Sequence, residues 1–416
     1  MRRKRRKKRF LLKTIISLVL AALVYGVVYL ASDLIDKQNE NTPGNDLTVN
    51  TSSTPSIVPT AATPEPTPEA PVFQEAVWVG VGDIMSHSPQ LPGAYIKAED
   101  RYDFDPFFNE VAPILKQGDW IMANLETPVA GADIGYSGYP TFNAPNELVE
   151  ALQNAGFNLL TTANNHSLDK GERGILRTLE LLQKLGLQYV GTAASQEEAE
   201  KLLLVEKNGI VMGILSYTYG TNGIPIPAGK DYLVSLIDET KIKADIHRIR
   251  EAGADVVTVA LHFGTEYQTM PNEEQKRLAR SLVAAGADII AGSHPHVLQP
   301  YELVETVDDN GNAKQAVIIY SMGNFISNQR GNSKDYGAIF KVNIRKNMTD
   351  KTIEISDVEV TPTWVHRYKP DQHYRYRILP VEETIAASSD KLLKPSDYEM
   401  LKKDFDMLVK RLEALK

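Results

Sequence analysis

The sequence predicts an α/β protein with one folded domain, and three observations carry this prediction. From residue 76 onward, short apolar runs alternate with amphipathic segments of helical period. Such alternation is typical of strands joined by crossover helices, so we expect a substantially parallel sheet. Polar residues able to bind a metal follow directly after several of the apolar runs. No internal repeat and no second region with its own apolar core are visible.

Composition and charge narrow the class of protein. The 416 residues include no cysteine, which excludes disulfides, cysteine nucleophiles and thiolate metal sites. Nine of the 45 lysines and arginines lie in residues 1–13, and residues 14–416 hold 36 basic against 53 acidic residues, a balance of −17. The net negative charge of residues 14–416 argues against nucleic acid as a partner.

The N-terminus predicts a membrane anchor. Residues 1–13 form a basic segment, and residues 14–32 are uncharged and mostly apolar. As a helix, this run would be about 28 Å long, which matches the hydrocarbon core of a bilayer. The positive-inside rule then keeps the basic segment in the cytoplasm and predicts a single-pass protein of the cell membrane with an extracellular C-terminal domain. A cleaved signal peptide with its site near Ala31 is the alternative.

Residues 33–75 change character, with seven prolines and almost no large apolar residues. A segment of this composition has no core of its own, so we expect a disordered linker that holds the folded part away from the membrane.

The elements of the predicted domain, residues 76–376, follow in order. Apolar runs predict strands at 77–81, 120–125, 157–161, 210–216, 256–261, 288–291 and 317–320. Amphipathic segments predict helices at 106–116, 145–154, 172–185, 238–252 and 272–285. Residues 336–362 are typical of a β-hairpin, and a C-terminal segment, 377–416, contains an amphipathic helix at 396–415.

Five of the strands end in residues suited to metal binding or proton transfer. Functional groups collect at the carboxyl ends of strands in open α/β sheets. Each residue alone has an ordinary explanation, since Asp83 could cap a helix and His166 or His262 could be structural. Together they predict one site. The candidate residues are Asp83, Glu126, Asn165, His166, His262, Glu266, His294 and His296.

The pair His294 and His296 is expected to lie in extended backbone, because Pro295 disfavours helix at the residue before it. Residues i and i+2 of a strand point the same way, so both imidazoles would face one metal. The predicted ligands are Asp83, Glu126, Asn165, His262, His294 and His296. This mixed nitrogen and oxygen set suits one or two divalent ions of Mn, Zn or Fe. Paired ions would make a positive island suited to an anionic substrate group.

Six segments in order resemble the CapA family of bacterial capsule-synthesis proteins, which is associated with poly-γ-glutamate. The resemblance covers roughly residues 76–330, and its segments lie at 82–85, 124–128, 163–169, 261–267, 292–299 and 320–325. It implies a fold similar to that of the calcineurin-like metallophosphoesterases, a two-sheet sandwich flanked by helices.

The resemblance also implies roles for single residues. Asp83 matches the first aspartate ligand, Glu126 stands near the bridging carboxylate, and Asn165 and His166 match an Asn-His pair whose histidine donates a proton or orients the substrate. Glu266 recurs in the family pattern without an assigned chemical role, and we expect it to support His262 from outside the ligand set. One ligand is missing, because Met85 stands where the phosphoesterases carry the histidine of Asp-x-His.

His87, in the following turn, is not an obvious replacement for that ligand. One of the two metal positions is therefore expected to be weak or empty, and phosphoesterase activity does not carry over from the resemblance.

Two functions remain open from the sequence. The first is a membrane-anchored extracellular capsule biosynthesis protein with a metal-dependent hydrolase-like site, acting on an anionic polymer, a cell-wall substrate or a phosphoester, with His166 as the catalytic acid. The second is a noncatalytic accessory that binds polymer or docks on membrane capsule-synthase subunits. A purely structural cell-wall protein is disfavoured by the residues gathered at the strand ends.

Overall fold

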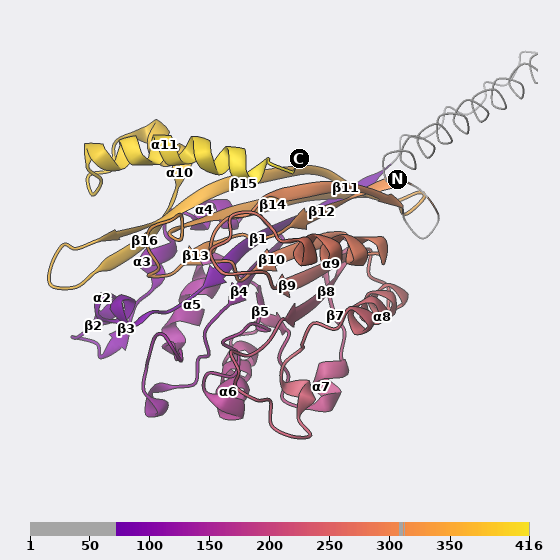
Figure 1. Ribbon diagram of the computed structural model, residues 1–416, viewed down its shortest axis with the longest axis horizontal. Coiled ribbons are helices and arrows are strands. Elements are labelled where there is room, and N and C mark those ends of the chain that lie inside the picture. Colours follow the sequence, from indigo (N-terminus) through magenta and orange to yellow (C-terminus); the bar gives the residue numbers. More distant parts are fainter. Residues whose placement is uncertain (1–71, 308–310, 312, 416) are drawn as a thin grey trace, which may run out of the picture. The chain divides into compact units, whose positions relative to one another are not determined.

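The computed structural model describes residues 72–307, 311 and 313–415 (Figure 1). The predicted basic segment, the membrane-spanning helix and nearly all of the linker lie outside these residues. Within the described part, no helix is both long and apolar enough to cross a bilayer. The first strand begins at Phe73, so the last three residues of the predicted linker are corrected to strand. Their backbone pairs with residues 345–347, a long-range contact that composition does not reveal.

The first sheet has its parallel strands in the middle and at one edge. The strand order is β16-β15-β14-β1-β4-β5-β6, and β13 pairs with the end of β1. β1, β4, β5 and β6 run parallel, whereas β14, β15 and β16 are antiparallel. The bounds are β1 Phe73–Ile84, β4 Trp120–Leu125, β5 Leu159–Thr161, β6 Gln188–Val190, β13 Asn324–Ile326, β14 Tyr336–Asn347, β15 Ile353–Tyr368 and β16 Arg375–Pro380.

The second sheet has a parallel centre and two antiparallel edges. Its order is β11-β12-β10-β9-β8-β7, in which β12, β10, β9 and β8 run parallel. The bounds are β7 Leu203–Lys207, β8 Ile210–Thr218, β9 Val256–His262, β10 Ile289–Ser293, β11 Tyr301–Val307 and β12 Ala313–Ile319. A separate two-stranded sheet joins β2 Tyr95–Ile96 to β3 Arg101–Tyr102.

Helices flank both sheets. α3, α4, α5 and α6 share an apolar cluster with the first sheet, and α8 and α9 share another with the second. The bounds are α2 Leu91–Ala94, α3 Asp105–Phe108, α4 Ala112–Leu115, α5 Asn146–Ala155, α6 Gly171–Lys184, α7 Gln196–Glu200, α8 Glu239–Glu251, α9 Glu273–Ala284, α10 Val381–Ala387 and α11 Pro395–Leu412. Short 3-10 turns lie at Ser88–Gln90, Ala132–Ile134 and Asp231–Leu233.

One predicted helix was wrong. The segment 106–116 forms two short helices, α3 and α4, because Pro113 has no N–H to continue the helical hydrogen bonds. Pro113 instead lies in the first turn of α4, where that missing donor costs nothing.

The two sheets pack face to face around a shared core. Trp78 and Trp120 of the first sheet belong to the same buried cluster as Met212, Ile214 and Ile289 of the second. Side chains alternate between the faces of a strand. Val79 of β1 therefore points away from Trp78 into the cluster beneath the helices. The predicted α/β fold is confirmed, with the two-sheet arrangement that the resemblance implied.

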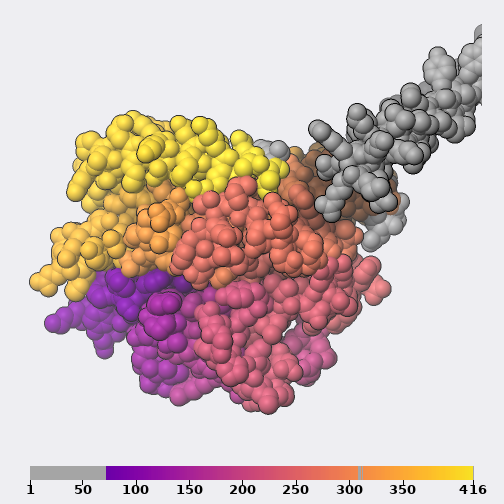
Figure 2. Space-filling view, viewed as in Figure 1, coloured from indigo at the N-terminus to yellow at the C-terminus, as the bar shows by residue number. Residues whose placement is uncertain are grey.

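The C-terminal segment continues this structure. β16 extends across the predicted boundary after residue 376 and pairs with β15. Leu401, Leu408 and Leu412 of α11 lie in the cluster that fills the sandwich. Figure 2 shows the yellow C-terminal residues packed along one side of the folded part.

The carboxyl ends of the parallel strands meet at one edge of the sandwich. Asp83 pairs with Asn124 across β1 and β4, and Ser293 pairs with His262 across β10 and β9. The backbone N–H of Asp83 also donates to the carbonyl of Gly323, 3.0 Å away. This edge is closely packed, because a Cβ added at Gly82 would overlap the Gly323 carbonyl.

The close approach at Gly82 predicts a stability effect. Gly82→Ala forces the backbone around residue 323 to shift, and we expect it to lower the free energy of unfolding by about 1–3 kcal/mol. Gly220→Ala is the control, because a Cβ there meets no atom within 4 Å. Chemical denaturation measures the free energy of unfolding of the two variants. Equal values would show that the backbones at residues 82 and 323 do not approach each other tightly.

Candidate metal centre

Glu126 occupies the middle of the candidate site. It follows β4 and its side chain is fully buried. Its Oε1 lies 3.6 Å from His262 Nε2 and 3.7 Å from His296 Nε2. This oxygen has no hydrogen-bond partner within the described part of the chain. A buried carboxylate oxygen without a donor is costly, and two imidazole nitrogens beside it make a site that a cation would satisfy.

Two groups of potential ligands share this carboxylate. One combines Asp83, Glu126 and His296, and the other combines Glu126, His262 and His294. In each group the ligand atoms lie within 4.8 Å of one another, and every member is buried. The strand ends and the loop after β10 thus bring together five of the six predicted ligands, of which Glu126 is the shared one.

The pKa values of Asp83 and Glu126 are shifted in opposite directions. Burial raises the pKa of Asp83, but hydrogen bonds from His296 and Asn124 and the charge of His296 outweigh it and hold the pKa below its usual value. Burial and the negative charge of Asp83 raise the pKa of Glu126 well above its usual value. Without a cation the ionised form of Glu126 is therefore disfavoured, and a divalent ion beside the two carboxylates would stabilise it.

Burial favours the neutral, metal-binding form of two of the histidines, His262 and His294. Burial lowers the pKa of His294 to about 4, with a further contribution from His296. Burial, followed by His294 and His296, lowers the pKa of His262 well below its usual value. His294 Nδ1 has no hydrogen-bond partner among the residues described. Neutral imidazoles with a free nitrogen fit a metal site.

The sixth predicted ligand, Asn165, lies against His262. Its Oδ1 is 3.0 Å from His262 Nε2, the same nitrogen that faces Glu126. Its amide group donates to Asn222 Oδ1, 3.2 Å away, which fixes which way the side chain points. Asn165 therefore offers an oxygen to the group formed by Glu126, His262 and His294.

His166 is oriented by a carboxylate. Its Nδ1 lies 2.8 Å from Asp169 Oδ2, which also accepts the backbone N–H of Phe142 at 2.7 Å. The carboxylate can only accept, so Nδ1 carries the proton and Nε2 is left free. Among the described residues, His166 belongs to neither of the two ligand groups that share Glu126, which leaves it available for proton transfer.

The backbone at His294 and His296 is not extended, so the expectation from the sequence is corrected. His294 has φ 96° and His296 has φ 58°, both in the left-handed region. The chain bends here, beyond the end of β10, and Pro295 does not hold it extended. Non-glycine residues adopt such angles only where the surroundings enforce them, and they cluster at functional sites. The rings still converge, with centroids 6.0 Å apart.

Three further predicted positions lie at the rim or beside the centre. The carboxylate of Glu266 is exposed and groups with His294 and His296, so it can also offer an oxygen directly. His87 Nδ1 accepts the backbone N–H of Asn328 at 3.2 Å, and the residue lies outside the ligand groups found among the described residues. Met85 is buried, with its N–H bonded to the carbonyl of Ile326.

Several polar residues that the sequence analysis did not assign hold the ligands in place. Asn124 Nδ2 donates to Asp83 Oδ1 at 2.8 Å and to Glu126 Oε2 at 3.3 Å. Ser293 Oγ lies 2.9 Å from His262 Nδ1, and Asn324 Oδ1 lies 3.1 Å from His296 Nδ1. Asn124, Ser293 and Asn324 all belong to the recognised segments, so their position there was the available signal.

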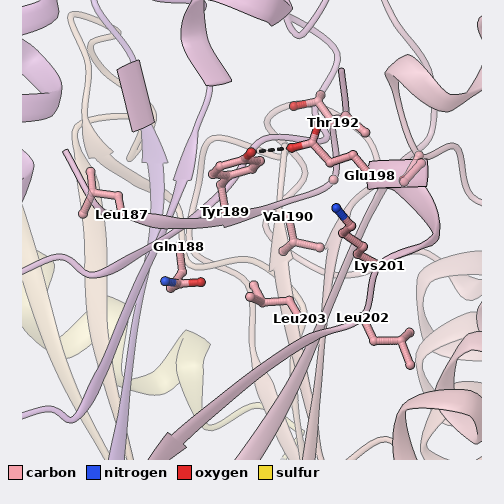
Figure 3. A pocket seen from close by; sticks show the side chains of 13 residues that line it. Leu187, Gln188, Tyr189, Val190, Thr192, Glu198, Lys201, Leu202 and Leu203 are labelled. Carbon is pink, nitrogen blue, oxygen red and sulfur yellow. Dashed lines mark hydrogen bonds between the residues drawn. The ribbon is translucent and has the colours of Figure 1, made fainter. Parts of the chain in front are cut away.

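A separate surface pocket lies away from this centre. It has a volume of about 310 Å³ and lies between β6 and the residues around α7 and β7, where Tyr189 donates to Glu198 (Figure 3). Leu187, Val190 and Leu203 are among the residues that line it. None of the candidate ligands lines this pocket, so it does not contribute to the metal centre.

Comparisons with known sequences give a consistent result. The profile described as "Bacterial capsule synthesis protein PGA_cap" matches residues 78–329. "PGA biosynthesis protein CapA" of Bacillus subtilis (strain 168) is 33% identical over 310 residues, covering 70% of this chain and 72% of that protein. "Capsule biosynthesis protein CapA" of Bacillus anthracis is 32% identical over 285 residues, covering 65% of this chain and 64% of that protein. The matched part is thus somewhat less than two thirds of the second relative.

Two solved structures match this chain at low sequence identity and with TM-scores below 0.5. Calcineurin-like phosphoesterase YfkN from Bacillus subtilis has a TM-score of 0.39 and 15% identity, covering 70% of this chain and 91% of that chain. The Haemophilus influenzae NAD nucleotidase NadN has a TM-score of 0.44 and 12% identity, covering 81% of this chain and 67% of that chain.

The left-handed backbone at His294 predicts different outcomes for two substitutions. His294→Ala and His294→Gly both remove a candidate ligand, so both should weaken binding of a divalent ion. Glycine adopts φ 96° without strain, so we expect the glycine variant to have the higher free energy of unfolding, by about 1–2 kcal/mol. Denaturant titration of the metal-free variants tests this. An alanine variant as stable as the glycine variant would show that the backbone at this residue relaxes without strain.

Proposed function

This chain belongs to the bacterial capsule synthesis protein family PGA_cap, and we propose that it is a metal-dependent hydrolase that acts on an anionic capsule polymer of the poly-γ-glutamate type or on a phosphoester. The names of two relatives, "PGA biosynthesis protein CapA" and "Capsule biosynthesis protein CapA", support a role in capsule biosynthesis. The buried oxygen of Glu126, without a donor and shared by two ligand groups, carries the proposal of a metal-dependent site.

The ligand set fits divalent ions. Asp83, Glu126 and His296 would hold one ion, and His262, His294 and Asn165 with Glu126 would hold the other. Nitrogen and oxygen donors without sulfur favour Mn, Zn or Fe. Such ions, when bound, polarise a substrate oxygen and lower the pKa of a coordinated water towards neutrality.

The chain's own residues supply orientation and proton transfer. Asp169 fixes the His166 ring with the proton on Nδ1. In its protonated form the ring can then give up the proton at Nε2 to a leaving group, with Asp169 stabilising the charged imidazole. Asn124 donates to both carboxylates and holds them at one spacing. His166 is therefore the proposed catalytic acid, and Asn124 and Asp169 are positioning residues.

A second function is favoured by one observation. Met85 is buried at the position where a phosphoesterase-like site would have a histidine ligand. A centre with one weak ion position supports binding of an anionic polymer without turnover. In this alternative the protein is a noncatalytic accessory that binds polymer or docks on membrane capsule-synthase subunits.

We further propose that the folded part acts outside the cell, anchored to the membrane by residues 14–32. The charge asymmetry of residues 1–13 and the length of the apolar run support this topology.

Turnover by the purified protein separates the two functions. Loaded with Mn²⁺ or Zn²⁺, the wild type should cleave a γ-linked glutamate polymer or a phosphodiester. His166→Ala should lower kcat by about a hundredfold or more while its metal content stays unchanged, because general acid catalysis contributes at least that factor. His247→Ala, an exposed histidine on α8, is the matched control and should have no effect.

A wild type that holds its metal, binds the polymer and shows no turnover would contradict the hydrolase and support the accessory. A His166→Ala variant with wild-type kcat would show that another group is the acid.

A further inference from the structure

A lysine ammonium lies at the rim of the candidate metal centre. Lys334 Nζ is 4.9 Å from the centre of the Tyr267 ring, and that ring is 6.2 Å from the His296 ring. Tyr267 is 46% exposed, so this side of the centre is open to solvent. The ammonium of Lys334 thus contacts a ring that itself borders a candidate ligand.

The backbone that carries Lys334 is tied directly to a candidate ligand. Asn324 Nδ2 donates to the carbonyl of Lys334 at 2.8 Å, and Asn324 Oδ1 lies 3.1 Å from His296 Nδ1. Three left-handed residues precede the lysine, with φ 71° at Gly331, 50° at Asn332 and 63° at Ser333. Two of these are not glycines, so the surrounding structure enforces the turn that delivers Lys334.

Tyr267 is placed by the same segment as the ligands. Its φ is 66°, which is unusual for a bulky residue. Its backbone N–H donates to the carbonyl of Pro295, 2.8 Å away, between the two candidate histidine ligands. The ring that supports Lys334 is therefore fixed relative to His294 and His296.

Among the described residues, Lys334 forms no ion pair. No carboxylate lies within ion-pair distance of its Nζ in the described ranges 72–307, 311 and 313–415, whereas Lys230 pairs with Glu172 and Lys314 with Asp288. Contact with a tyrosine face is weaker than a salt bridge and uses none of the three N–H donors. Those donors remain available to an anionic oxygen.

We propose that Lys334 is a substrate-positioning residue that binds an anionic oxygen, a carboxylate or a phosphate, next to the group that enters the metal centre. Tyr267 serves as its platform. An anionic polymer repeats its charge along the chain, so one charged group can contact Lys334 while a neighbouring one reaches the ligands. This inference rests on the proposed function and assigns it a specificity-determining residue.

Binding of two anions to the full-length protein tests the inference. Calorimetry with the Mn²⁺-loaded protein would use a γ-linked glutamate oligomer in one arm and inorganic phosphate in the other. Lys334→Gln should weaken binding about tenfold, the size expected for one charge-assisted hydrogen bond. Lys334→Arg should restore most of the affinity. Where turnover is measurable, Lys334→Gln should raise KM with kcat nearly unchanged.

Lys369→Gln is the matched control, because Lys369 also lies over a tyrosine ring, that of Tyr374 at 5.5 Å, at a position with no candidate ligand. It should bind both anions like the wild type. Bound manganese, measured on every variant, should be unchanged in Lys334→Gln.

Each outcome bears on the inference. Weakening in the oligomer arm alone supports it with a carboxylate source, weakening in the phosphate arm alone supports it with a phosphoester source, and weakening in both supports the shared chemistry. Wild-type affinity in Lys334→Gln overturns the inference and leaves the proposed function standing. Loss of manganese together with affinity also overturns it, since Lys334 would then support the metal centre itself. A wild type that binds neither anion overturns it as well, and turnover then decides the proposed function separately.

Discussion

The buried carboxylate of Glu126 is the constraint on which the rest of the centre depends. Burying a charge without a partner is strongly unfavourable. In the metal-free protein, Glu126 Oε1 is buried without a hydrogen-bond donor, so the ionised carboxylate is destabilised. The fold nevertheless keeps the group in place, because Asn124 donates to Oε2 and β4 ends directly before it. His262 and His296 approach the same oxygen from the second sheet and its following loop. The packing of two sheets thus creates a site that a cation would complete.

Backbone strain is concentrated around this carboxylate. Ten non-glycine residues among those described have positive φ, and six of them lie in loops that border the centre: Asn222, Tyr267, His294, His296, Asn332 and Ser333. Each such residue costs on the order of 1–3 kcal/mol, so the core of the sandwich must supply the stability that keeps them in place. Trp78 and Trp120, fully buried between the sheets, contribute to that stability. The stability of the fold and the geometry of the site are therefore linked.

The sequence predicted which residues meet but not how the backbone presents them. Asp83, Glu126 and His262 follow apolar runs, and parallel strands bring such positions to one edge, so their meeting follows from pattern alone. The left-handed angles at His294 and His296 depend on long-range contacts of the loop after β10, which no local preference encodes. Asn324 holds His296 from β13, a three-residue strand too short to recognise as an element. The break in the helix at 106–116 was readable from Pro113, whereas the three strand residues before position 76 depend on pairing with β14.

Metal titration tests the shared carboxylate most directly. Calorimetry with Mn²⁺ should give up to two ions per wild-type chain, with one lost in Asp83→Ala and one in His262→Ala, because each of these residues belongs to a single ligand group. Glu126→Ala should weaken both, because its carboxylate is common to the two groups. A Glu126→Ala protein that binds Mn²⁺ with the stoichiometry and affinity of the wild type would contradict the account.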